Sequence, residues 1–208
     1  MTFVSETAQV PTAPFALGRT RVEDVKLTHQ HDVDASVDHM WRAFTDLKRV
    51  GRCFPGAHVS EVTGDDFVGA LKVKLGPFVL TYDGVGSMTK QDESARVAQV
   101  KATGKERHGF GKADITIDVR LSEISARRSS VHITTTLDVK GAPTNLGGGI
   151  GQRASDPLIE HFVMCLSGPA SASTGGPDDE PLDIGRAVLP GLVASYGRSM
   201  RRLGRKKR

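Results

Sequence analysis

The spacing of hydrophobic and polar residues changes twice along this chain, and each change predicts a different kind of element. From Val22 to Val33 the two kinds alternate, which is typical of a strand with one buried face. Ser36 then offers a helix N-cap, and apolar residues follow it at helical spacing, at positions 37, 40, 41 and 44. This pattern predicts a short helix after the first strand, and a second helical turn follows at 47–50.

Alternating segments fill the middle of the chain and are separated by short turns rich in Gly, Asp and Ser. They cover positions 57–63, 66–75, 78–89, 96–106, 110–121 and 130–140, with the last turn expected at 127–129. Because these turns are too short for crossover helices, we expect antiparallel strands. The last two segments show the clearest faces, which carry Ile115, Ile117, Val119 and Leu121, and then Val131, Ile133, Thr135, Leu137 and Val139.

Helical periodicity returns after Asn145. Apolar residues recur every three to four positions on a helix of about 20 residues, and they are Leu146, Ile150, Ala154, Leu158, Phe162, Cys165 and Leu166. A sheet with one apolar face and a helix with one apolar stripe bury both by packing together. The expected fold is therefore α+β, with a curved antiparallel sheet of about seven strands wrapped around the long C-terminal helix and two short helices after the first strand.

Pattern and composition divide the chain into four parts. Residues 1–20 lack periodicity, so we expect them to form a flexible N-terminal arm, and we expect residues 21–166 to form the folded domain. We expect residues 167–182 to be a flexible linker, because this stretch consists mostly of Ser, Gly, Pro, Ala and acidic residues that cannot build a core. Residues 183–208 form a basic amphipathic tail.

The tail concentrates the positive charge of the protein. It holds eight Arg or Lys residues against Asp183, a net charge of +7, whereas the whole chain carries +4. Its longest uncharged stretch, 187–197, is 11 residues and is too short to span a bilayer. Apolar residues recur on one helical face, so we expect the tail to lie on an anionic membrane surface. The predicted membrane-binding residues are Val188, Leu192, Tyr196, Arg198, Arg201, Arg202, Arg205, Lys206, Lys207 and Arg208.

Other interpretations of the tail are a solvated segment, a nucleic-acid-binding segment or one that docks on an acidic protein. The interleaved Val, Leu and Tyr favour the membrane, and no nucleic-acid partner is expected. The chain has two cysteines, Cys53 and Cys165, which argues for a reducing compartment and against a disulfide scaffold. The N-terminus shows no secretory signal. We therefore expect a cytoplasmic protein associated peripherally with the inner face of the cell membrane.

The sequence contains no pattern that indicates catalysis or a metal site. His29 and His31 share one face of the first strand, but no third ligand stands at a suitable spacing, so buried, hydrogen-bonded histidines are the favoured interpretation. Cys53 has no His or Asp placed by the sequence to activate it. The glycine run Leu146–Gly151 lacks the phosphate-loop pattern. We expect a protein that is neither an enzyme nor a metalloprotein.

Five strings of residues carry a family resemblance, at 37–41 with Phe44, 52–57, 69–77, 82–84 and 109–113. Together they resemble the G-subunit family of carbon monoxide dehydrogenase, which belongs to the START-like, Bet v 1-like helix-grip group. The resemblance covers residues 22–166 and implies a space for a ligand between sheet and helix. It also implies a partner, a molybdenum-containing carbon monoxide dehydrogenase or a related molybdenum hydroxylase, and an accessory role in bringing that enzyme to the membrane.

On this fold, large apolar residues are expected to face the space between sheet and helix. The predicted ligand-binding residues are Phe54, Phe78, Leu80, Tyr82, Phe110, Leu158 and Phe162. Gly and Ala at sheet positions 69, 70, 84, 86, 98 and 102 fill space poorly, which favours a cavity over the alternative of a solid core. Tyr82 is interpreted either as a hydrogen-bond donor to a ligand carbonyl or as an ordinary core tyrosine.

A cavity joined to a membrane-binding tail predicts a carrier. A dehydrogenase that oxidises carbon monoxide passes its electrons to a lipid-soluble quinone, which a cytoplasmic enzyme cannot reach inside the bilayer. We therefore expect a bound apolar ligand, a respiratory quinone such as menaquinone, and no covalently bound cofactor. The alternatives are a membrane anchor without a ligand and an enzyme of the polyketide cyclase or aromatase kind.

Overall fold

The computed structural model describes residues 25–75, 78–109, 111–140, 150–169 and 182–183, and in this part eight strands form one sheet. The strands are β1 (Val25–Val33), β2 (Ala57–Thr63), β3 (Asp66–Leu75), β4 (Phe78–Asp92), β5 (Val97–Glu106), β6 (Lys112–Ser125), β7 (Arg128–Lys140) and β8 (Leu182–Asp183). The helices are α1 (Val37–Thr45), α2 (Leu47–Cys53) and α3 (Ile150–Ser167).

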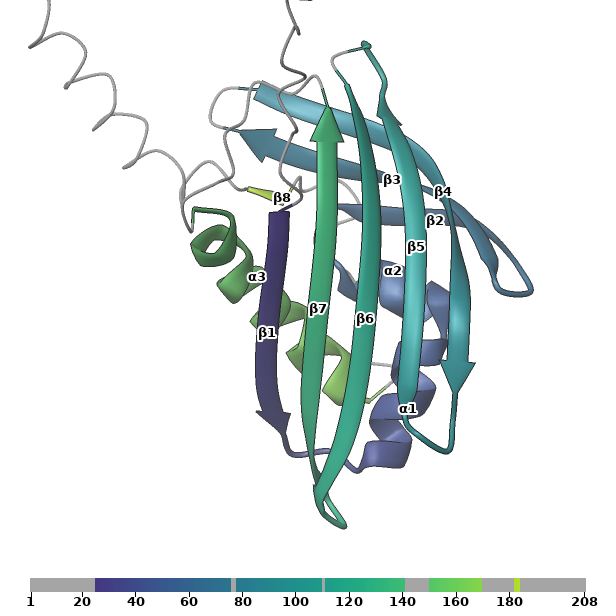
Figure 1. Ribbon diagram of the computed structural model, residues 1–208, viewed down its shortest axis with the longest axis vertical. Helices are drawn as coiled ribbons and strands as arrows, with labels where there is room; N and C mark the ends of the chain where they lie inside the picture. The colour runs from purple at the N-terminus through teal and green to yellow at the C-terminus, as the bar shows by residue number, and fades with distance from the viewer. Residues whose placement is uncertain (1–24, 76–77, 110, 141–149, 170–181, 184–208) are drawn as a thin grey trace, which may run out of the picture.

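Seven strands are antiparallel neighbours in the order β1-β7-β6-β5-β4-β3-β2, and the two-residue β8 adds to β3 in parallel. The three helices lie on one side of the curved sheet, with α3 behind β1 and β7 (Figure 1). The predicted arrangement of one antiparallel sheet, two short helices after the first strand and a long later helix is confirmed.

The hairpin of β6 and β7 is longer than the alternation predicts. The pair extends to Ser125 opposite Arg128, so Ser129 lies inside β7 and not in the turn expected at 127–129. Ser129 is fully buried, and its hydroxyl donates to the Ala35 carbonyl at 2.9 Å. Because nearly every residue around this turn is polar, the two-residue period of the strands is not visible there in the sequence.

Side-chain caps start both short helices. The Ser36 hydroxyl accepts a hydrogen bond from the His39 N–H at 3.2 Å, which confirms the predicted N-cap of α1. The Asp46 carboxylate accepts from the Arg49 N–H at 3.0 Å and caps α2 in the same way. The caps fix where each helix begins, and α1 then buries Met40, Trp41 and Phe44 against the sheet.

The strand register divides the sheet into an inner face, which looks toward the helices, and an outer face. Along β6 the inner face carries the predicted set from Ile115 to Leu121, and along β7 it carries the set from Val131 to Val139. The closed core lies at the end of the inner face nearest α1, where strand and helix residues are buried together. Its members include Met40, Phe44, Val119, Leu121, Val131, Ile133, Ile159, Phe162, Val163 and Leu166.

Candidate functional site

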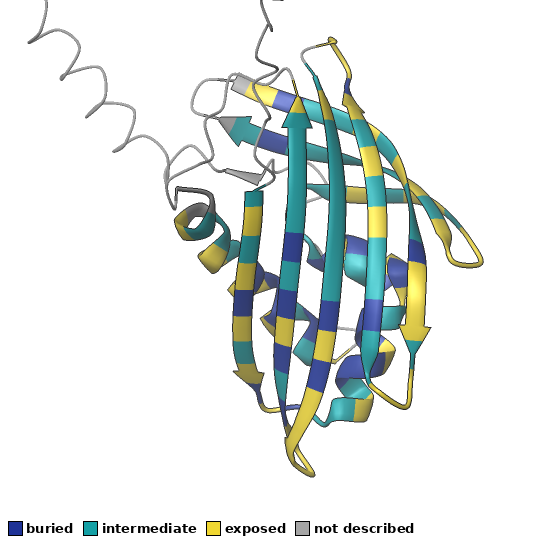
Figure 2. Cartoon of the chain, viewed as in Figure 1, coloured by how far each residue is buried: buried dark blue, intermediate teal, exposed yellow. Residues whose placement is uncertain are grey.

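The end of the inner face farther from α1 is not fully covered, and we call it the open end. It lies where β5 ends at Glu106, β6 begins at Lys112 and β7 ends at Lys140. Toward this end β6 and β7 change from buried to intermediate exposure (Figure 2). The half-buried inward residues there are Leu71, Tyr82, Ala102, Ile115, Leu137 and Val139. An apolar surface that the chain covers only partly suits an apolar ligand.

A row of small residues crosses this surface. Gly69, Gly84, Gly104 and Ala113 are direct partners on four neighbouring strands. A Cβ on Gly69 would lie 2.4 Å from the His58 carbonyl oxygen, and one on Gly84 would lie 2.4 Å from the Thr103 carbonyl oxygen. Neighbouring backbone therefore approaches too closely for any side chain at these two positions. The row leaves a strip of inner face with no large side chain on it.

Two polar groups border the strip at the open end. Tyr82 and Glu106 are direct cross-strand partners on the inner face. Burial, and to a lesser degree the charge of Glu106, raises the pKa of Tyr82, so its hydroxyl stays protonated and able to donate. The Glu106 side chain has no exposed surface and accepts from the His108 N–H at 2.6 Å. We did not single out Glu106 from the sequence, although its inward place in the alternation of β5 was a usable signal.

The predicted ligand-binding residues fall into two groups. Leu80 and Tyr82 lie on the inner face of β4, with Leu80 buried and Tyr82 half-buried. Phe162 is buried in the core, and its ring lies 5.4 Å from that of Phe54, centroid to centroid. Leu158 packs beside them and is half-buried. The half-buried members, Tyr82, Phe54 and Leu158, are the ones a ligand can reach without moving the core.

Several predicted residues cannot be placed. Phe78 begins β4 opposite Leu75, but its side chain is outside the described part of the structure. Phe110 and the predicted tail residues beyond 183 also lie outside the described residues. Their roles stay predictions.

Only some of the small sheet residues predicted to leave space on the inner face do so. Ala70 lies on the outer face, because its partner Asp83 and its neighbours Val68 and Lys72 point outward. Ala98 is 2% exposed within the core. Gly86 is covered by an aromatic ring, since a Cβ there would lie 2.3 Å from Phe67 Cζ. Space on the inner face therefore rests on the row that contains Gly69, Gly84 and Gly104.

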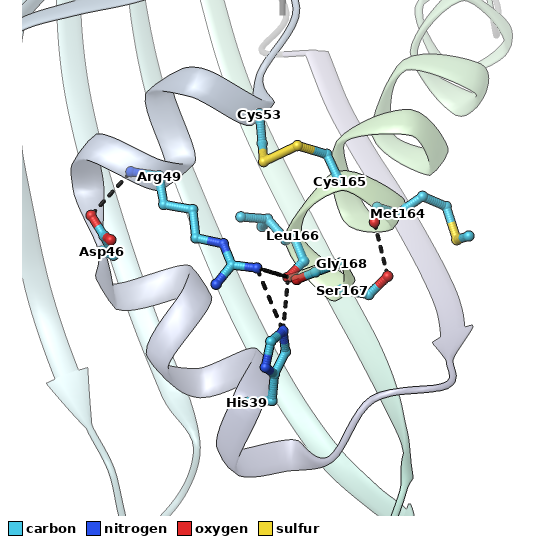
Figure 3. Close-up of a disulfide and its surroundings, with 9 residues drawn as sticks. All are labelled: His39, Asp46, Arg49, Cys53, Met164, Cys165, Leu166, Ser167 and Gly168. Carbon is cyan, nitrogen blue, oxygen red and sulfur yellow. Dashed lines mark hydrogen bonds between the residues drawn. A yellow bond between two sulfur atoms is a disulfide. The ribbon is translucent and has the colours of Figure 1, made fainter. Parts of the chain in front are cut away.

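A disulfide joins Cys53 of α2 to Cys165 of α3, with the two sulfur atoms 2.08 Å apart (Figure 3). The presence of only two cysteines was interpreted as evidence against a disulfide scaffold. The structure corrects this interpretation, because it joins the two cysteines in one disulfide. The two cysteines are 112 positions apart, so only the packing of α2 against α3 brings them together. Neither is a free thiol, which leaves Cys53 without the nucleophile that a catalytic role would need.

The Arg49 side chain forms a second connection between α2 and the end of α3. Its Nη2 donates to the Leu166 carbonyl at 2.7 Å and to the Gly168 carbonyl at 2.5 Å (Figure 3). The Leu166 carbonyl belongs to the last turn of α3, where no later helical N–H group can bind it, and Gly168 directly follows the helix. A buried cation at a helix C-terminus is also favoured by the helix dipole. Together with the disulfide, Arg49 holds α3 in position beside the inner face.

His29 is buried and hydrogen-bonded, as the sequence favoured. Its Nε2 lies 2.9 Å from Ser155 Oγ and 3.4 Å from Asp156 Oδ1. Ser155 Oγ donates to the Gln152 carbonyl at 3.0 Å, so Nε2 carries the proton and donates to Ser155. Burial lowers the pKa of His29 more than Asp156 raises it. Within the described ranges, no three His, Cys, Asp or Glu side chains gather in a way that could hold a metal ion.

Two further observations concern the surface. A hollow of about 450 Å³ lies on the outer face between β4 and β7, on the opposite side of the sheet from the predicted ligand space. Its lining consists of Val85, Lys101, Ala102, Thr103, Asp114, Ile115, Thr116, Thr136 and Asp138, of which Ala102 and Ile115 are inward residues of β5 and β6. A search of the described residues for helices long and apolar enough to cross a membrane finds none.

The curved antiparallel sheet, the long helix beside it and the partly open inner face define a protein with a helix-grip fold. The chain belongs to the CoxG family, the G-subunit family of carbon monoxide dehydrogenase, whose model matches residues 30–171. This finding confirms the resemblance seen in the sequence.

Solved structures support the same fold. The chain is similar to a conserved protein from Geobacillus kaustophilus, with a TM-score of 0.62 and 15% identity over 72% of this chain and 97% of that chain. It is also similar to a protein from Thermus thermophilus, with a TM-score of 0.50 and 11% identity over 73% and 100% of the two chains. At such low identities these similarities describe the fold alone. No curated protein matches the sequence.

Proposed function

We propose that this protein is a non-enzymatic accessory protein of a molybdenum-containing carbon monoxide dehydrogenase or a related molybdenum hydroxylase. In this proposal the open end of the inner face binds a respiratory quinone such as menaquinone, and the basic tail links the enzyme to the cytoplasmic membrane. Family membership supports the association with the dehydrogenase. The observation that carries ligand binding is the apolar, half-buried surface around Leu71, Ile115 and Leu137.

The chemistry of a quinone fits this surface. A flat ring can approach the backbone along the row of Gly69, Gly84 and Gly104, where no large side chain intervenes. The protonated Tyr82 hydroxyl can donate a hydrogen bond to a quinone carbonyl. Each Å² of apolar surface removed from water contributes about 25 cal/mol, so an isoprenoid chain laid along Ile115 and Leu137 adds affinity without a specific contact.

A matched pair of substitutions on β6 tests ligand binding. Ile115 points inward and its neighbour Thr116 points outward, as their partners Leu137 and Thr136 do. Ile115→Trp fills the proposed site, and we expect it to lower the amount of bound quinone at least about tenfold, a loss of roughly 1.4 kcal/mol. Thr116→Trp places the same ring on the outer face and should leave quinone binding unchanged. Equal quinone content in the two variants would count against the proposed site.

Tethering is tested with anionic vesicles and a chain that ends at residue 181. We expect the full chain to bind the vesicles and the shortened chain to remain in solution, because the tail supplies the basic and apolar residues. Equal binding would reject the tail as the anchor. Vesicle binding with no quinone in any preparation would favour an anchor without a ligand.

A cyclase of the polyketide kind would need polar groups that converge on a substrate. Tyr82 and Glu106 are adjacent, but the Glu106 carboxylate is engaged by His108 and the Thr81 N–H. Turnover of a polyketide substrate that is lost in Tyr82→Phe would favour this alternative over a carrier.

A further inference from the structure

Three lysines occupy one cross-strand row on the outer face, at the open end of the sheet. Lys105 is the direct partner of Lys112, and Lys112 is the direct partner of Lys140. All three are exposed. Like charges directly opposite one another destabilise a sheet, so the row acts against the stability of the isolated domain. Nearby carboxylates offset part of this repulsion, with Asp114 3.7 Å from Lys112 and Asp138 2.8 Å from Lys140.

Other basic residues extend the row across the same end of the outer face. Lys72 pairs with Thr81 and Lys74 with Val79, and the Arg107 N–H donates to the Thr81 carbonyl. With the three lysines, this makes six basic side chains against Asp83, Asp114, Asp138 and Asp183, the last of which is the direct partner of Lys74. Outside the tail the chain carries more acidic than basic residues, so the clustering at this end is not a property of the whole surface. Val79, on the same face, is 50% exposed.

The chain returns to this end just before the tail begins. Leu182 and Asp183 form β8, which pairs in parallel with Val73 and Lys74 of β3. Figure 1 shows β8 at the same end of the molecule as the tip of β7. The base of the tail is thus fixed to the sheet beside the basic residues and beside the open end of the inner face.

We propose that this end of the domain is a second membrane-contacting surface, in which Lys105, Lys112 and Lys140 bind anionic lipid headgroups next to the tail. The inference rests on the proposed function, because the tail brings the domain to the membrane. The contact turns the open end of the inner face toward the bilayer, where a ligand can pass between lipid and protein. A lipid surface fits better than an acidic protein because β8 fixes the base of the basic tail here and because Val79 is exposed among the charges.

The test compares two triple variants of the full chain on vesicles with and without anionic lipid. The row variant is Lys105→Gln, Lys112→Gln, Lys140→Gln. The control variant is Lys90→Gln, Arg120→Gln, Arg127→Gln, which removes the same charge from exposed positions at the other end of the sheet. In about 0.1 M salt we expect the row variant to bind anionic vesicles about tenfold more weakly than the native chain and the control to bind as the native chain does.

The outcomes separate the inference from the function on which it rests. Equal binding by the two variants overturns the inference, whether both are weakened or neither is. A row variant that binds vesicles normally but fails to bind the dehydrogenase also overturns it, since the surface is then a protein-docking site. The affinity of the row variant for quinone added in the absence of vesicles should match that of the native chain, because its lysines lie on the outer face. The tether is tested separately with the chain that ends at residue 181, which lacks the tail and should lose its binding to anionic vesicles.

If the row variant fails to fold, hydrogen exchange of the native chain tests the proposed membrane contact instead. On anionic vesicles we expect slower exchange at residues 105–109 and 111–112 than in solution. The hairpin at 122–130, at the opposite end, should exchange at the same rate in both conditions. Slowing at 122–130 without slowing at 105–112 overturns the proposed orientation.

Discussion

Buried polar side chains connect α3 to the rest of the domain. His29 on β1 reaches Ser155, and Arg49 on α2 reaches the carbonyl groups at the end of α3. Burying such groups is costly unless they are hydrogen-bonded, so each contact favours one position of the helix over others. The position of α3 in turn decides how much of the inner face remains open.

Acidification should weaken the fold through His29. Burial lowers its pKa in the folded chain, so the unfolded chain binds a proton first as the pH falls. The stability that neutral His29 contributes is present above its ordinary pKa of 6.5 and is lost as the pH falls below that value. We expect the native Tm to drop between pH 7 and pH 5 and the drop to be smaller in His29→Gln.

The outer-face residue His132 provides the control for this measurement. It is exposed on β7, so His132→Gln should leave the pH dependence of the native protein unchanged. An identical drop in Tm for the native chain and His29→Gln would contradict the assignment.

Removing the Arg49 side chain should destabilise the protein more than removing an equivalent charge from the surface. Arg49→Met removes the buried donor of the Leu166 and Gly168 carbonyls, of which Leu166 keeps the longer contact with His39 Nε2 at 3.3 Å, and this loss costs about 1–3 kcal/mol. Arg52, one turn later on the same helix, is exposed, and Arg52→Met should change the free energy of unfolding by less than about 0.5 kcal/mol. Denaturant unfolding of both variants decides the matter, and equal losses would refute a specific role for Arg49.

At the scale of elements, periodicity predicts most of the fold. The strands and helices follow the alternation and the helical stripe, because each element has one buried face that the sequence must supply. The β6–β7 hairpin was underestimated where Ser129 and its neighbours are polar on both faces. The disulfide was missed because the approach of Cys53 to Cys165 depends on how helices pack. The strand β8 was missed because two residues carry no period.

The candidate site was predicted less completely than the fold. The inward position of Tyr82 follows from strand alternation, and the structure agrees. The glycine row could not be foreseen, because Gly69, Gly84 and Gly104 become neighbours only when two strand registers are known. The core position of Phe162 depends on its contacts with Phe44 of α1 and with Phe54, which directly follows α2.

Two glycines of this row offer a matched test of how closely the strands approach. A Cβ on Gly84 would lie 2.4 Å from a backbone oxygen, whereas one on Gly104 would have its nearest neighbour at 3.4 Å. We expect Gly84→Ala to cost about 1–3 kcal/mol of stability and Gly104→Ala to be neutral or slightly stabilising. Thermal unfolding distinguishes them, and a Gly84→Ala variant as stable as Gly104→Ala would show that the sheet can relax there.

The disulfide between α2 and α3 should contribute strongly to stability. Its two cysteines are 112 positions apart, and cross-links of this kind typically contribute about 2–4 kcal/mol by restricting the unfolded chain. We expect the variant Cys53→Ser, Cys165→Ser to unfold at lower denaturant concentration than the native protein. A thiol reductant should lower the native midpoint to a similar value and leave the double variant unaffected. An unfolding midpoint of the native protein that is the same with and without the reductant would argue against the disulfide.

At the scale of the whole molecule, three features meet at one end. The inner face is only partly covered there, the lysine row crosses the outer face there, and β8 fixes the base of the tail there. The closed core, with α1, lies at the other end. Under the proposed function, this arrangement would place ligand exchange beside membrane contact and leave the rest of the described surface available to a dehydrogenase.

The most direct test of ligand binding is mass spectrometry of organic extracts from the full chain purified from its own host. We expect a respiratory quinone in extracts of the native protein and of Thr116→Trp, and its loss from Ile115→Trp. Repeated native preparations that yield neither a quinone nor any other lipid would contradict the proposed carrier role and leave the protein a membrane anchor with a filled interior.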